Sequence, residues 1–272
     1  MLDPLTSQRP PTVTEMPYDE SVMFTISTFI PYIGCILFAL YQLIFRFDPT
    51  STLFMLGGSL CVVLDPLINA LGCCYFAKTD LILHAHDGRP IPWFMLASYG
   101  TFNGGFGYWW FTKFRSQKTP MTARSVWKLW AFAYVSNLFL EYPVNQWGLQ
   151  SYFGFQPFKV LGMPLWFPAI NSTMPIIAAS IINVLTKAEV LKGWKKLAII
   201  LIIPSADILA NGAMAWPVWI ALAVDEGYHI SYPMGVVTFV LVAISLTLVG
   251  LQFDGPEGSS NKSNGKQNGK AR

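Results

Sequence analysis

Charged residues are scarce in this chain: only 12% of its 272 residues are Asp, Glu, Lys or Arg. A typical soluble domain carries about 25%. Hydrophobic residues make up 53% of the sequence, and the mean hydropathy is +0.43. Because the uncharged residues form long continuous runs, the composition excludes an ordinary soluble domain and predicts an all-α integral membrane protein.

Several catalytic and cofactor motifs are also missing. The sequence contains no P-loop, no GxSxG and no HExxH motif, and no aspartate-rich cluster that would hold magnesium on a diphosphate. Its four cysteines have neither metal-site nor disulfide-framework spacing. We therefore expect no cofactor and no metal. The net charge of +3 reflects membrane orientation and does not indicate nucleic acid as a partner.

The apolar runs predict a bundle of seven transmembrane helices, each about 20 residues or longer. The predicted spans are approximately residues 22–45, 51–76, 92–112, 127–148, 165–186, 197–223 and 232–252. They define a membrane domain over 22–252, between a polar N-terminal segment over 1–21 and a disordered cytosolic tail over 253–272. The polar lead lacks the basic start of a cleaved signal peptide, so the first span is expected to be retained. The last span has no lysine, which excludes a retinal Schiff base.

The basic residues set the predicted orientation. With the N-terminus outside, 14 of the 18 Lys and Arg residues fall in inner loops or the tail. Only Arg9, Lys78, Arg89 and Lys159 fall outside. This asymmetry follows the positive-inside rule and predicts an outer N-terminus and a cytosolic C-terminus. The expected location is the endoplasmic reticulum membrane.

Three carboxyl residues lie deep within predicted spans: Asp65, Glu141 and Asp207. Each has at least one asparagine four positions away, on the same face of its helix. These asparagines are Asn69, Asn137, Asn145 and Asn211. The pattern predicts one polar spot inside the bundle that opens toward the outer side.

Other spans offer further candidates for the same spot. Tyr99 and Asn103 from the third span and Asn171 from the fifth are expected to face it. Most of the 41 aromatic residues suit belts at the two membrane interfaces. Four aromatic residues are nearer the acids and could supply π-faces to a cation: Trp93, Tyr99, Trp147 and Trp166.

The intramembrane acids have two interpretations. They could simply hydrogen-bond helices together. However, a carboxyl group in the bilayer costs a few kcal/mol, which favours a functional role. No span supplies a Lys or Arg partner, so such a carboxyl group stays protonated at neutral pH. It could then act as a general acid, shuttle protons in a transporter or bind a cation.

Three stretches carry a resemblance to a known family. They are "LDPLINALG" at 64–72, "GRPIPWF" at 88–94 and "LEYPVNQWGLQSYFGFQPFKVLGMPLWFPAIN" at 140–171. Together they resemble the small membrane-bound terpene cyclases of fungal meroterpenoid biosynthesis, of the ascofuranone and macrophorin type. The resemblance covers roughly residues 50–172.

The resemblance implies an isomerase-type enzyme of secondary metabolism whose substrate is a prenylated aromatic or epoxyfarnesyl compound dissolved in the bilayer. A carboxyl group protonates the terminal epoxide or olefin, and the carbocation then closes rings without loss of diphosphate. Asp65 and Glu141 are the implied catalytic acids. The expected substrate-binding residues are Asn69, Trp93, Tyr99, Asn103, Asn145, Trp166, Asn171, Asp207 and Asn211. No obligatory protein partner is expected.

Two other functions remain open from the sequence. A proton-coupled small-molecule transporter would use the same carboxyl groups for proton binding. Transporters often carry inverted repeats, and no repeat is visible here. A structural or accessory subunit would leave the three intramembrane acids without a purpose.

Overall fold

The computed structural model describes residues 14–86 and 89–253. The predicted tail from 254 onward and the first 13 residues of the predicted polar segment lie outside these ranges. The first helix begins at Tyr18, four residues before the predicted start of the first span and inside the predicted polar segment.

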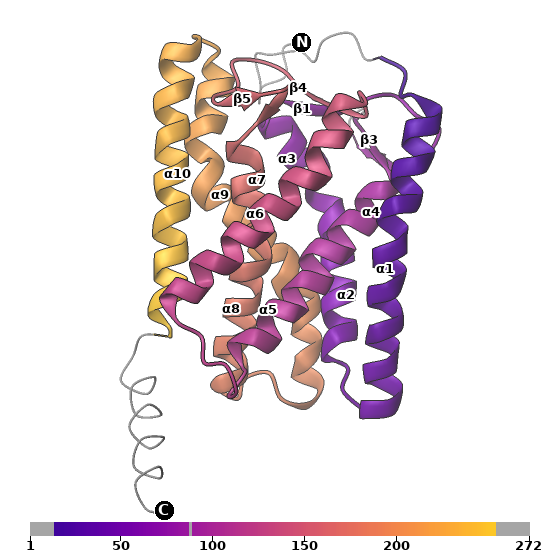
Figure 1. The fold of residues 1–272 in the computed structure, drawn as a ribbon, viewed down its shortest axis with the longest axis vertical. Coiled ribbons are helices and arrows are strands. Elements are labelled where there is room, and N and C mark those ends of the chain that lie inside the picture. The colour runs from indigo at the N-terminus through magenta and orange to yellow at the C-terminus, as the bar shows by residue number, and fades with distance from the viewer. Residues whose placement is uncertain (1–13, 87–88, 254–272) are drawn as a thin grey trace, which may run out of the picture.

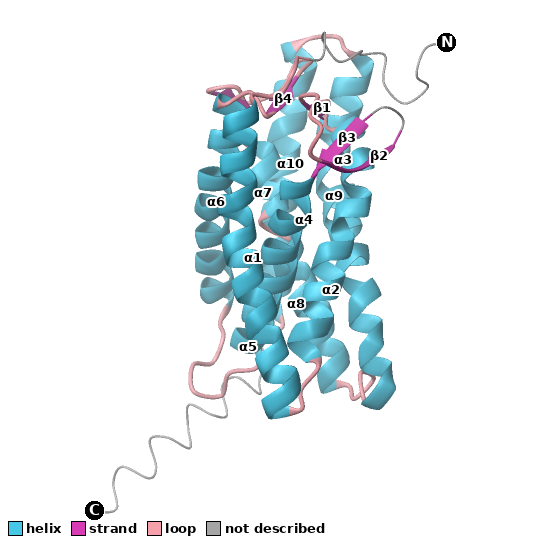
Figure 2. Cartoon of the chain, turned by 90° about the vertical axis from the view of Figure 1, so that its right-hand side faces the viewer, coloured by secondary structure: helices cyan, strands magenta, loops and turns pink. Residues whose placement is uncertain are grey.

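The chain folds into a bundle of long helical columns, with short strands gathered at one end (Figures 1 and 2). In chain order, the columns are α1 (Tyr18–Arg46); α2 (Thr50–Leu60), the 3₁₀ turn η1 (Cys61–Leu64) and α3 (Asp65–Leu71); α4 (Trp93–Tyr99), the π-helical η2 (Gly100–Phe106) and α5 (Gly107–Phe114); α6 (Ala123–Gln146); α7 (Trp166–Asn171) and α8 (Met174–Lys187); the 3₁₀ turn η3 (Gly193–Ala198) and α9 (Ile199–Val224); and α10 (Tyr228–Leu251).

Within the described ranges, five columns are long and apolar enough to cross a membrane. They are Tyr18–Arg46, Thr50–Leu71, Trp166–Lys187, Gly193–Val224 and Tyr228–Leu251. Two more helical columns, residues 93–114 and α6, coincide with the other predicted spans but carry more polar residues. The chain therefore has the character of an all-α membrane protein, and the count of seven spans stays a prediction.

Two columns change helix type at a proline or at a group of glycines in their sequences. Pro66 follows Asp65 at the start of α3, and the preceding turn narrows to the 3₁₀ turn η1. The third column widens into the π-helical turn η2, whose sequence GTFNGGF holds three glycines. A Cβ atom on Gly58 of α2 would collide with the backbone of Gly104 in η2. The absence of side chains at both positions lets these two segments pack backbone to backbone.

The outer segments predicted as loops contain three antiparallel ribbons. β1 (Cys74–Phe76) pairs with β4 (Gln150–Tyr152), β2 (Ile82–His86) with β3 (Arg89–Pro92), and β5 (Lys159–Val160) with β6 (Met163–Pro164). The prediction of a span as far as residue 76 was too long, because α3 ends at Leu71 and Cys73 adopts a left-handed backbone with φ 48°. We call the end of the bundle that carries these ribbons the strand-bearing end (Figure 1).

Most columns pack around a core that includes the fully buried rings of Phe54, Trp110 and Trp166. α1 differs, since it stands at one side of the bundle and leaves most of its apolar side chains exposed (Figure 1). An exposed apolar surface of this extent is expected where lipid covers the protein.

Candidate functional site

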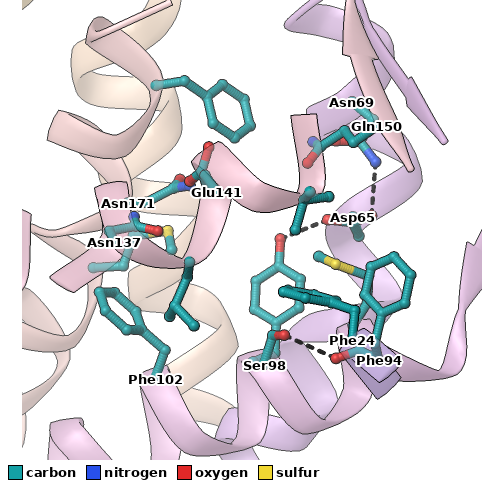
Figure 3. Close-up of a pocket in the computed structure, with 16 residues that line it drawn as sticks. Phe24, Asp65, Asn69, Phe94, Ser98, Phe102, Asn137, Glu141, Gln150 and Asn171 are labelled. Carbon is teal, nitrogen blue, oxygen red and sulfur yellow. Dashed lines mark hydrogen bonds between the residues drawn. The ribbon is translucent and has the colours of Figure 1, made fainter. Parts of the chain in front are cut away.

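A pocket lies in the half of the bundle nearer the strand-bearing end, and Figure 3 shows the side chains around it. Its cavity volume is about 90 Å³, which is smaller than the 300–1,000 Å³ typical of drug-sized ligand sites. It is lined by Phe24, Asp65, Asn69, Phe94, Met95, Ser98, Tyr99, Phe102, Asn137, Leu140, Glu141, Val144, Gln150, Phe167, Asn171 and Met174. Most of the lining surface is apolar or aromatic, although half of the lining residues carry polar groups, two of which are carboxyl groups.

Asp65 is held by two neutral donors. Asn69, one turn later on α3, donates from Nδ2 to Oδ2 at 2.7 Å. Tyr99, at the end of α4, donates from its hydroxyl to Oδ1 at 2.7 Å. Asp65 is only 2% exposed, so its carboxyl group is fixed between two helices and shielded from solvent.

Glu141 is held in the same way by residues from other elements. Asn171, at the end of α7, donates from Nδ2 to Oε1 at 2.9 Å. Tyr152 of β4 donates from its hydroxyl to Oε2 at 3.1 Å. Glu141 is partly exposed, unlike Asp65, and the two carboxyl groups lie close enough to interact electrostatically. Each acid therefore has one tyrosine hydroxyl and one asparagine amide as its partners.

No cation neutralises these acids among the residues that the structure describes. The ion pairs found there join Lys78 to Glu15, Lys192 to Glu189 and Lys196 to Asp48, all with exposed or half-exposed side chains. Lys159, in β5, donates to the backbone oxygen of Tyr152 at 2.7 Å and makes no ion pair with Glu141. Partial burial lowers the pKa of Lys159. The pocket acids thus have neutral partners only.

The third acid belongs to a separate polar cluster within the bundle. Asp207 is 1% exposed and accepts from Asn211 Nδ2 at 3.1 Å, and it also interacts with Cys61. Asn211 also contacts the sulfur of Met174 at 3.2 Å, and Met174 lines the pocket. The single polar spot expected from the sequence is therefore two clusters, and Asp207 and Asn211 do not reach the pocket surface.

Five of the predicted site residues line the pocket. They are Asp65, Glu141, Asn69, Tyr99 and Asn171. The remaining predicted residues lie elsewhere: Trp93, Asn103, Asn145, Trp166, Asp207 and Asn211.

Four of these residues take no part in the hydrogen bonds of the pocket acids or of Asp207, and each has different surroundings. Trp93 is 41% exposed and lines a shallow groove with residues of α1. Trp166 is fully buried and donates from Nε1 to Gln156 Oε1 at 3.1 Å, which is a core contact. Asn145 follows the pocket-lining stretch of α6 without entering the pocket. Asn103 is buried inside the π-helical turn, where hydrogen bonds run from i to i+5 and residues four apart no longer share a face.

Two polar lining residues, Ser98 and Gln150, were not proposed from the sequence, and neither was Tyr152, the partner of Glu141; Asn137, expected in the polar spot, also lines the pocket. Asn137 lies four residues before Glu141 on the same helix face, as expected from the sequence, whereas Ser98 is adjacent to Tyr99 and helical spacing does not predict it. Gln150 and Tyr152 arrive through the pairing of β4 with β1, which brings residues about 76 positions apart together. No local sequence pattern predicts that contact.

Chemically, the pocket presents two carboxyl groups from different sides to a space with mostly apolar walls (Figure 3). Comparisons with protein-family models, curated proteins and solved structures give no match for this chain. Its function is therefore inferred from the chemistry of the pocket.

Proposed function

We propose that this chain is an integral-membrane terpene cyclase of meroterpenoid secondary metabolism. It protonates the terminal epoxide or olefin of a farnesyl-type chain on an aromatic head and guides the resulting carbocation through ring closure. Asp65 and Glu141 are the proposed acids, one as proton donor and the other as its partner. A proton enters at the start of the cascade and another leaves at its end, so the product is an isomer of the substrate.

The observation that carries this proposal is that two carboxyl groups face one apolar pocket and are held by neutral donors alone. A carboxylate without a cationic partner is strongly disfavoured in apolar surroundings, so each group is expected to keep its proton. A neutral carboxylic acid can hydrogen-bond to an epoxide oxygen and then donate its proton.

The remainder of the lining suits a carbocation. Phe24, Phe94, Phe102 and Phe167 surround the pocket with aromatic rings, whose negative faces attract a positive charge. The mostly apolar walls would keep water away from the cation until ring closure is complete. The bilayer itself concentrates a prenylated substrate, since each buried CH₂ group contributes about 0.8 kcal/mol.

We further propose seven spans, with the columns 93–114 and α6 completing the five apolar ones. These two less apolar columns supply Ser98, Tyr99, Asn137 and Glu141, so the pocket itself accounts for their polarity. The strand-bearing end would face away from the cytosol, because Arg46, Lys113 and Lys187 lie at helix ends on the opposite side. The proposed location is the endoplasmic reticulum membrane.

The direct test is product analysis in a host that makes the protein and receives a farnesylated aromatic compound or its terminal epoxide in separate cultures. A cyclase gives a product of unchanged mass with fewer double bonds or an opened epoxide. Asp65→Asn and Glu141→Gln keep the shape of the side chains but remove the proton, so at least one should lose about 10²–10⁴-fold in activity.

The matched control is Glu189→Gln, which changes an exposed acid paired with Lys192. It should leave activity unchanged. Full activity in both Asp65→Asn and Glu141→Gln, at normal expression, would rule out the proposal. If neither substrate is converted but the protein drives pH-dependent uptake into vesicles, the same carboxyl groups belong to a transporter.

A further inference from the structure

The pocket is closed at both ends of the bundle. Toward the strand-bearing end, β1, β4 and the residue before β4 cover it with buried side chains, including Phe76, Leu149 and Gln150, which are 2%, 0% and 7% exposed. Toward the opposite end, Phe102, Trp110 and Met174 are buried at 7%, 0% and 4%. A molecule that approaches along the bundle axis therefore meets packed side chains on either side.

The side of the bundle between α4 and α6 is different. α6 is attached to α7 on its other flank, where Trp130 Nε1 donates to Ala169 O at 3.1 Å and Tyr134 donates to Leu165 O at 3.4 Å. Among the described residues, no side-chain hydrogen bond joins α6 to α4 or η2, and α4 and α6 are not a closely packed pair. Residues of both helices line the pocket, and in Figure 1 both columns run at a slant across one face of the bundle.

Aromatic contacts close this seam above and below the pocket. At the strand-bearing end, Phe24 meets Trp147 with ring centroids 6.3 Å apart. Toward the opposite end, Phe132 of α6 meets Phe106 and Trp109 at 6.1 and 6.0 Å. Between these contacts, the pocket is flanked by Met95 and Ser98 of α4 and by Leu140 of α6.

The flanking residues are accessible from outside the bundle. Leu140 is 39% exposed, and Met95 and Ser98 are partly exposed, although all three line the pocket. None of them is charged, and the neighbouring position on α6, Phe139, is 77% exposed, as expected for a residue in contact with lipid. Uncharged residues that line the pocket are therefore also part of the outer, apolar surface of the bundle.

We propose that the side of the pocket between Met95, Ser98 and Leu140 is a lateral portal through which the prenyl tail of the substrate enters from the bilayer. This inference rests on the proposed function and adds the route and the direction of entry. The tail enters first and reaches Asp65, which is the more deeply buried acid, while the aromatic head stays near the partly exposed Glu141. A bilayer-dissolved substrate then never crosses water on its way to the acids.

Cysteine labelling in membranes tests the portal without measuring catalysis. Ser98→Cys and Leu140→Cys are made in a Cys35→Ser background, since Cys61, Cys73 and Cys74 are fully buried while Cys35 is not. Each variant is treated with an alkyl-chain maleimide dissolved in the bilayer, or with a charged maleimide applied to both sides of opened membranes. Phe139→Cys is the lipid-facing control, and Ala97→Cys, at a fully buried position of α4, is the buried control.

The portal predicts that the alkyl reagent modifies positions 98, 139 and 140 and spares 97. A farnesylated aromatic compound should slow labelling at 98 and 140 but not at 139. Faster labelling of position 98 by the charged reagent would overturn the proposal, because the pocket would then open to water. Absence of labelling at both 98 and 140, with 139 labelled, would overturn it as well.

The portal and the cyclase proposal fail in different ways. Labelling at 98 and 140 with substrate protection, but no cyclised product, retains the portal and removes the cyclase. Product formation without labelling at 98 and 140 retains the cyclase and removes the portal. A second pair of variants uses bulk: Leu140→Trp should reduce product formation by about tenfold or more, and Phe139→Trp, one residue away but facing lipid, should leave it unchanged.

Discussion

The hydroxyl group of Tyr99 lies 2.7 Å from Oδ1 of Asp65, although the two residues are 34 positions apart in the chain. Glu141 has a matching relationship with Tyr152 at 3.1 Å. A tyrosine hydroxyl can both donate and accept hydrogen bonds, so it can hold a carboxyl group in either protonation state. Each tyrosine is thus placed to orient its acid before and after proton transfer.

This arrangement predicts the effect of Tyr99→Phe and Tyr152→Phe. Each substitution keeps the ring and removes one hydrogen bond to an acid, a change of about 1 kcal/mol in folding free energy. If the tyrosines position the acids, the variant whose tyrosine holds the proton donor should lose about tenfold or more in kcat with little change in KM. Steady-state kinetics in membranes with a farnesylated aromatic epoxide measures both constants.

Comparison of the two tyrosine variants also identifies which acid is the proton donor. A larger kcat loss in Tyr99→Phe assigns proton donation to Asp65, and a larger loss in Tyr152→Phe assigns it to Glu141. A purely structural role would instead lower the melting temperature of both proteins and leave kcat of the folded fraction intact.

Asp207 offers a contrast to the pocket acids. It is buried with Asn211 and Cys61 and does not line the pocket. Asp207→Asn keeps an oxygen that can accept a hydrogen bond from Asn211. The substitution leaves the pocket acids in place, so it should change stability more than rate. We therefore expect the cyclisation rate to stay within about twofold of that of the unaltered protein. The measurement is product formation per amount of folded protein, compared between Asp207→Asn and Asp65→Asn. A loss as severe as that of Asp65→Asn would place Asp207 in the catalytic machinery.

Trp166 is expected to act in folding, not in substrate binding. Its Nε1 donates to Gln156 Oε1, and Gln156 Nε2 donates to the backbone oxygens of Gly72 and Phe153 at 2.8 and 3.0 Å. Trp166→Phe leaves a buried acceptor unpaired, which costs about 1–3 kcal/mol. We predict a lower melting temperature in detergent and an unchanged KM. A raised KM at unchanged melting temperature would mean that the indole contacts substrate.

Helical spacing in the sequence was enough to predict some of the local contacts. Asn69 bonds to Asp65 and Asn211 to Asp207, each four residues later on the same helix face. For Glu141, spacing places Asn137 in the same pocket, but the amide that donates to Glu141 is Asn171, 30 positions away. Local spacing describes one helix, whereas the partner of Glu141 depends on how α6 meets α7.

The apolar runs likewise predicted the helical columns but not their interruptions or the ribbons at one end. Segments such as Gln150–Tyr152 are too short to show the alternation of apolar and polar residues that is typical of a strand. They form strands because they pair with segments far away in the sequence. The π-helical turn η2 depends on a close approach to α2, which no one-dimensional pattern reveals. The portal is a relation between two helices and is equally invisible in the sequence.

Gly58 tests how far the pocket depends on that close approach. A Cβ atom there would overlap the backbone of Gly104, and a backbone cannot rotate aside as a flexible side chain can. Overpacking of this kind costs about 1–3 kcal/mol or more. Because η2 follows directly from Tyr99, displacement of η2 would also lengthen the hydrogen bond from Tyr99 to Asp65.

Gly58→Ala should therefore lower both the melting temperature and the cyclising activity of the protein that remains folded. Gly212→Ala in α9 is the matched control, since nothing lies within 4 Å of a Cβ at that position. There, alanine should be neutral or stabilise the helix by up to about 1 kcal/mol. Melting curves by fluorescence-detected size exclusion, paired with product assays, compare the two variants. Equal stability of both proteins would mean that α2 and η2 can separate without cost, and the π-helical turn would then not be fixed by glycine packing.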